Sequence, residues 1–103
     1  MEIHVTKRLR NGVPSVEIRV GRIDMEDTAL FRKYGVPTVD VPAVGSFEAQ
    51  TVRIVPQTIL FAEAKDSEML ELWKDDVVSK IRSSVESLRN KVDDVSGTEV
   101  FVI

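Results

Sequence analysis

The sequence predicts an α+β fold from three features: a hairpin turn near the N-terminus, several short apolar segments after it, and one long helical stripe. We expect an N-terminal β-hairpin and three further strands in a mixed or antiparallel sheet. One short helix and one long amphipathic helix complete the prediction, with the long helix packed on a sheet face. The length fits a single α+β domain spanning residues 1–103.

The hairpin is predicted over residues 2–20 by the Asn11-Gly12 dipeptide. A two-residue type I′ turn needs positive φ at both central residues, and this dipeptide adopts that conformation readily. If Arg10 faces Val13, the numbers of facing residues sum to 23, and almost every apolar side chain lies on one face. His4 then lies on the more polar face, where we interpret it as a half-exposed strand residue rather than a general base.

A short helix is predicted over about 25–33. Asp24 is placed to cap its N-terminus, and Gly35 is placed to end it. The segment 36–49 that follows carries two prolines and one glycine among its valines. This composition fits either one short irregular strand or a long ordered loop.

Strand character returns over residues 50–63, with an interruption at Pro56. The part after the proline is apolar on both faces, which is typical of a strand covered on both sides. Residues 100–103 have the same character, and they predict a final strand tucked into the sheet.

The long helix is predicted over about 67–92, with Asp66 as a suitable N-cap. Apolar residues recur there at gaps of three and four, which is the spacing of one helical face. These residues are Leu70, Trp73, Val77, Ile81, Val85, Leu88 and Val92.

This helix is long for the size of the chain. At about 1.5 Å per residue it spans about 39 Å, whereas a globule of this length is about 33 Å across. The helix must therefore bend near Ser83-Ser84, or its far end must pack against another molecule. A symmetric dimer is the commonest such partner, and we expect its interface at Val85, Leu88 and Val92.

The composition excludes several classes of site. The absence of cysteine excludes disulfides and thiolate catalysis, and a single histidine disfavours multi-histidine metal sites and histidine-based triads. The acidic pairs and the scattered glycines match neither a cation-binding loop nor a phosphate-binding loop. We therefore expect no metal and no cofactor. No run is apolar enough to span a membrane, so we expect a cytoplasmic protein with no membrane partner.

Basic residues gather near the hairpin tip although the chain has a net charge of −3. A basic two-stranded ribbon can hold phosphates or enter a nucleic-acid groove. Charged tips are more commonly solvated ends that prevent aggregation. The candidate anion-binding residues are Lys7, Arg8, Arg10 and Arg19.

Three functions remain open from the sequence. The first is a non-catalytic protein-interaction or assembly module that self-associates, through the long helix or a sheet edge, as a homodimer or with another protein. The second is a binder of an anionic ligand or nucleic acid at the basic tip, which the acidic total disfavours. The third is a small enzyme that uses carboxylate, serine or lysine groups.

Overall fold

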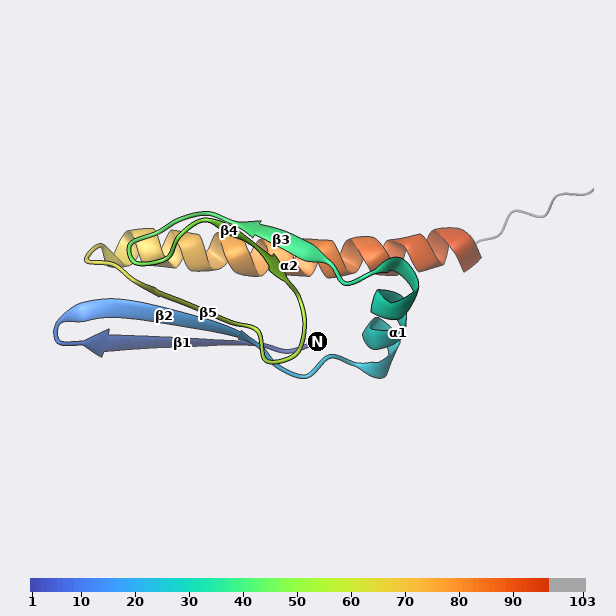
Figure 1. The fold of residues 1–103 in the computed structure, drawn as a ribbon, viewed down its shortest axis with the longest axis horizontal. Coiled ribbons are helices and arrows are strands. Elements are labelled where there is room, and N and C mark those ends of the chain that lie inside the picture. Colours follow the sequence, from blue (N-terminus) through green and yellow to red (C-terminus); the bar gives the residue numbers. More distant parts are fainter. Residues whose placement is uncertain (97–103) are drawn as a thin grey trace, which may run out of the picture.

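The structure is a computed structural model that describes residues 1–96, and it confirms the α+β class. Figure 1 shows one long helix running beside a set of antiparallel strands, with a short helix near one end. The predicted strand at residues 100–103 lies outside the described residues. In chain order the elements are β1 (Ile3–Arg10), β2 (Val13–Val20), α1 (Met25–Tyr34), β3 (Thr38–Val41), β4 (Gln50–Arg53), β5 (Ile59–Glu63) and α2 (Ser67–Ser96).

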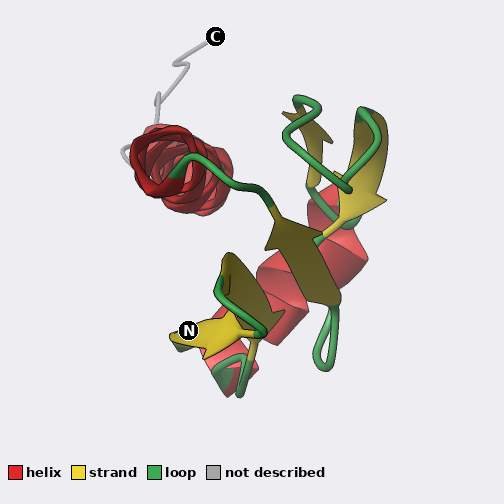
Figure 2. Ribbon diagram, turned by 90° about the vertical axis from the view of Figure 1, so that its left-hand side faces the viewer, coloured by secondary structure: helices red, strands yellow, loops and turns green. Residues whose placement is uncertain are grey.

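The five strands form two antiparallel sheets rather than the one sheet that we expected. One sheet has the order β1-β2-β5, and the other pairs β3 with β4. The break follows Pro56, where the chain turns back and the Gln57 N–H donates to the Val20 carbonyl over 3.0 Å. β5 therefore joins β2 instead of β4. Figure 2 shows the strands as a curved layer that bends around α2.

The hairpin has the predicted register. Ile3 faces Val20, Val5 faces Ile18 and Arg10 faces Val13, so the numbers of facing residues sum to 23 throughout. Asn11 and Gly12 have φ of 52° and 78°, as a type I′ turn requires. The two strands differ in burial: β2 places Val16, Ile18 and Val20 in the core, whereas β1 has no buried residue.

The short helix α1 ends as predicted at Gly35, whose N–H donates to the Phe31 carbonyl. Its N-terminus differs from the prediction. Asp24 occupies the N-cap position, but its side chain makes no capping hydrogen bond. The Asp24 carboxylate instead accepts a hydrogen bond from the Met1 amino group over 3.0 Å. The Asp24 carboxylate, which we expected to accept hydrogen bonds from the N–H groups of α1, therefore binds the Met1 ammonium group instead.

The segment 36–49 contains both structures that the sequence left open. β3 occupies its first part, and a tight turn with a bridge between Val44 and Phe47 follows. Gly45 lies in this turn with φ of 50°, and a Cβ atom there would meet the Glu63 carbonyl oxygen at 2.0 Å. Only glycine allows the turn to approach β5 so closely.

The long helix α2 begins as predicted, since Asp66 Oδ1 accepts hydrogen bonds from the N–H groups of Glu68 and Met69. It extends to Ser96, past the predicted end, and it has no break at Ser83-Ser84. Figure 1 shows that its second half continues beyond the strands. The first half packs its apolar face into the main core, where Leu70, Trp73, Val77 and Ile81 are buried.

Candidate interaction surface

β1 is an edge strand, and the hairpin geometry decides which of its backbone groups are free. The Glu2 N–H donates to the Arg22 carbonyl over 3.0 Å, and the Glu2 carbonyl accepts from the Gly21 N–H over 2.9 Å. Bonding alternates along an antiparallel pair, so the even-numbered residues of β1 bond to β2. Within residues 1–96 the odd-numbered residues have no backbone partner on the outer side: Ile3, Val5, Lys7 and Leu9.

The free edge of β1 is long, and it carries exposed apolar side chains as well as charged ones. β1 has eight residues, whereas β3 and β4 have four each. The opposite edge of the same sheet, at β5, is partly covered. There the Ser46 N–H donates to the Glu63 carbonyl, and the Ser46 hydroxyl oxygen accepts from the Glu63 N–H. Val5 is 38% exposed and Leu9 is 72% exposed. A long edge with exposed apolar side chains is a surface to which another strand adds readily.

A groove separates β1 from α2 along this edge. Its larger part is a hollow of about 670 Å³, lined on one side by Val5 and Lys7 and on the other by Lys74, Val78 and Arg82. A second hollow of about 240 Å³ continues from Arg82 toward Ile3 and Arg89. The inner face of β1 is therefore only partly covered by the helix.

Ion pairs link the two sides of the groove. The Lys7 Nζ atom lies 2.6 Å from Glu71, which also binds Lys74 over 2.6 Å. Hydrogen bonds from Lys7 and then Lys74 lower the pKa of Glu71. Hydrogen bonds to Asp75 and then Glu71 raise the pKa of Lys74. The positive charge of Lys7, whose side chain lies on the face of the hairpin turned toward α2, is thus compensated by the carboxylate of Glu71 on α2.

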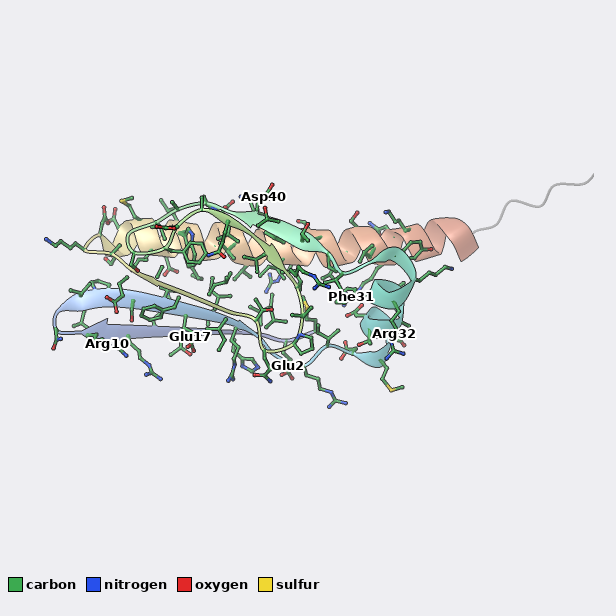
Figure 3. The ribbon with its side chains drawn as sticks, viewed as in Figure 1. Glu2, Arg10, Glu17, Phe31, Arg32 and Asp40 are labelled. Atoms are coloured by element: carbon green, nitrogen blue, oxygen red, sulfur yellow. The ribbon has the colours of Figure 1, made fainter. Side chains whose placement is uncertain are left out.

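The four predicted anion-binding residues do not form one cluster. Lys7 lies on the face of the hairpin that is turned toward α2. Arg8, Arg10 and Arg19 occupy register positions on the opposite face of the hairpin, called its outer face below. Figure 3 shows Arg10 and Glu17 on the side of the hairpin turned away from α2. A hollow of about 260 Å³ on this outer face is lined by Arg8 and Arg10 but also by Glu17. The Arg10 guanidinium lies 3.9 Å from Glu63.

The predicted interface residues of α2 are covered within the chain. Val85 and Leu88 are buried against Phe31, in a small cluster formed with α1. α1 thus supplies the cover that the sequence argument assigned to another molecule. The side chain of Val92 lies outside the described residues. Val85 and Leu88 are therefore buried within the chain itself.

A buried ion pair fastens α1 to the second half of α2. The Arg89 Nε atom donates to Asp27 Oδ1 over 2.9 Å, and Arg89 Nη2 donates to Asp27 Oδ2 over 2.7 Å. Asp27 is nearly inaccessible, whereas Arg89 is half exposed. The hydrogen bonds from Arg89 hold the pKa of Asp27 below its usual range, although burial opposes them. Two charge-assisted bonds in fork geometry fix the angle between the helices.

The single histidine and the acidic side chains do not form a metal site within the part of the chain that the structure describes. His4 is exposed and pairs with Glu2 over 3.2 Å. Among residues 1–96, no three metal-ligating side chains come together. No described helix is both long and apolar enough to cross a membrane.

Sequence reasoning named a sheet edge as a possible surface without identifying the strand that forms it, although the sequence contains part of the signal. The Asn11-Gly12 turn fixes which residues bond across the hairpin, so it also fixes which backbone groups face outward. What it does not give is the neighbour of β1 on the outer side. That depends on β5, which pairs with β2 from 40 to 48 residues further along the chain.

Comparison with known proteins adds no relative: no family model, curated protein or solved structure matches the chain.

Proposed function

We propose that this chain is a non-catalytic, cytoplasmic protein-interaction module that self-associates through the free edge of β1. One observation carries the proposal: β1 has eight residues, unpartnered backbone groups on its outer side within residues 1–96, and an open groove beside it. Strand addition to such an edge satisfies the backbone groups and gives side chains a place against α2.

The distribution of charge supports self-association more than anion binding. The arginines of the hairpin lie on the outer face among Glu17 and Glu63. Nucleic-acid sites usually show a continuous basic stripe. The free edge, in contrast, offers Val5 and Leu9 together with backbone donors and acceptors, which are the groups that strand pairing uses.

The test is a proline at a position whose N–H faces outward. Val5→Pro removes one donor from the free edge and leaves the β1–β2 ladder complete, because only even-numbered residues bond to β2. We expect the unaltered chain to form dimers in sedimentation equilibrium. Val5→Pro should be monomeric at the same concentrations, with an unchanged far-UV circular dichroism spectrum.

The matched control is Thr6→Pro, one residue further along the same strand. Its N–H faces β2, so this substitution removes a bond within the hairpin and should lower the midpoint of urea unfolding. A chain that is monomeric before any substitution would contradict the proposal. So would a Val5→Pro variant that dimerises as strongly as the unaltered chain.

A further inference from the structure

The free edge of β1 restricts how two copies can pair. Residues that exchange hydrogen bonds in an antiparallel pair face each other. An outward-facing residue, meaning one whose backbone N–H and C=O point away from β2, must therefore lie opposite another outward-facing residue. The outward-facing residues of β1 are odd-numbered, so the numbers of facing residues must sum to an even value. In a two-fold symmetric pair, one residue then lies opposite its own copy. Three centres keep most of the strand paired: Val5, Thr6 and Lys7.

Charge and the length of strand that is paired separate these three registers. A centre at Lys7 places Arg8 and Arg10 opposite Thr6 and His4 without any carboxylate. A centre at Val5 places Glu2 opposite Arg8, but it pairs only residues 3–7 of β1 with one another and leaves Leu9 beyond the start of the partner's β1. Both registers leave an unfavourable feature at the edge.

The centre at Thr6 pairs residues 3–9 of β1 with one another and gives Arg10 a carboxylate partner, although Arg8 still lies opposite His4. Glu2 then lies opposite Arg10 of the second copy, and Ile3 lies opposite Leu9. The side chains of Glu2 and Arg10 are both about two-thirds exposed. Within residues 1–96 each has one polar side-chain partner, Glu2 with His4 at 3.2 Å and Arg10 with Glu63 at 3.9 Å. Opposite charges and apolar side chains in facing positions both stabilise an antiparallel pair.

We infer that two copies of this chain join β1 to β1 in antiparallel orientation, with Thr6 of each copy opposite Thr6 of the other. This inference rests on the proposed function and specifies its partner and register. The result is one continuous six-stranded sheet, in the order β5-β2-β1-β1-β2-β5. The two-fold axis is perpendicular to the sheet, so both copies of α2 lie on the same side.

In this arrangement the second copy's β1 lies next to the groove between β1 and α2. The hollow of about 670 Å³ lies between β1 and α2, and the second copy's β1 would extend the sheet beside it. Lys7 lies opposite Val5 of the second copy, but its Nζ atom remains on Glu71 at 2.6 Å, so its charge is already compensated. The exposed side chain of Leu9 is covered by Ile3 of the second copy.

A single cysteine reports the register directly. The chain has no cysteine, so Thr6→Cys introduces the only thiol. Facing residues in a non-hydrogen-bonded pair have Cα atoms about 4.5 Å apart, which lies within the range of about 4.4–6.8 Å that a disulfide spans. We expect Thr6→Cys to form a covalent dimer under a mild oxidant, faster than His4→Cys or Arg8→Cys alone. An equimolar mixture of those two variants should cross-link as a mixed dimer, because position 4 faces position 8.

Charge exchange gives an independent measurement. Arg10→Glu and Glu2→Arg should each weaken dimerisation by about tenfold, because each places like charges opposite one another twice per dimer. The double variant should restore the dimer. Arg8→Glu is the matched control, since it lies opposite His4 and should change the dissociation constant much less.

The outcomes separate the register from the proposed function. A dimer that Val5→Pro disrupts, but whose fastest cross-link forms through Val5→Cys or Lys7→Cys, would overturn the Thr6-centred register and leave edge pairing intact. A double charge variant no stronger than the single variants would also overturn the register. A monomer at every concentration would overturn the register and the proposed function together.

Discussion

The two halves of α2 carry the same apolar stripe but pack against different partners. The first half places Leu70, Trp73, Val77 and Ile81 in a core that both sheets share. The second half places Val85 and Leu88 against Phe31 of α1 in a much smaller cluster. The spacing of apolar residues therefore specifies which face of a helix is buried, but not which element buries it.

The two halves also differ in what else holds them. Around the first half, the Trp73 Nε1 atom donates to the Pro42 carbonyl over 2.8 Å and the ring packs on Phe47. Around the second half, the main additional bond is the fork between Asp27 and Arg89. A small cluster with one ion pair opens at lower free energy than a core shared by two sheets, so we expect α1 to separate from α2 before the sheets unfold.

Ile81→Ala should give the largest effect, because Ile81 is 1% exposed and lies among strands of both sheets. Truncation to alanine removes buried methyl groups and leaves a cavity that these strands cannot fill, at a cost of about 3–4 kcal/mol. Urea unfolding measures this loss, and Ser83→Ala on the exposed face is the control, with an expected change of about 0.5 kcal/mol or less. A loss below about 1 kcal/mol for Ile81→Ala would contradict the central place of this residue.

Leu88→Ala should have a smaller and more local effect. Leu88 is 8% exposed, and the few residues around it can partly collapse into the space, so we expect a loss of about 2 kcal/mol. Hydrogen exchange distinguishes the two halves: the amides of α1 should exchange faster, while those of β2 keep their protection. Equal acceleration in β2 would show that the two clusters unfold as one unit.

The sequence predicted most of the fold because local rules decide most of it. The Asn11-Gly12 turn sets the hairpin register, Asp66 caps α2, and Gly35 ends α1. The same rules failed at Asp24, where a nearby ammonium group competes for the carboxylate. They also failed to separate the two sheets, because the turn after Pro56 bonds to Val20, which is distant in the chain.

The surface was less predictable than the fold. The length of α2 led us to expect a bend near Ser83-Ser84 or a second molecule at its far end, whereas α1 covers Val85 and Leu88 within the chain. Asp27 lies in the first turn of α1, where the helix dipole favours a negative charge, but it also binds Arg89, 62 residues away. The free edge of β1 likewise follows from which strands pair with β2, and that pairing is a property of the whole chain.

The smallest effect is expected from Asp27→Asn, which removes the charge of the ion pair but keeps the shape of the side chain. Arg89 is half exposed, so solvent screens part of the interaction, and we expect a loss of about 1–2 kcal/mol near neutral pH. Asp76→Asn is the matched control. Its exposed pair with Lys80, at 2.9 Å, should contribute about 0.3–0.5 kcal/mol.

The pH dependence of the same pair gives a sharper test. The pKa of Asp27 is lower in the folded chain than in the unfolded chain, so the unfolded chain takes up the proton first as the pH falls. The stabilisation is therefore complete above the unfolded pKa of about 3.9, and it is lost as the pH drops through the lower folded pKa. The difference in unfolding free energy between the unaltered chain and Asp27→Asn should be full at about pH 7 and should shrink toward zero in strong acid. A difference that stays constant with pH would mean that shape and hydrogen bonding, rather than charge, hold α1 against α2.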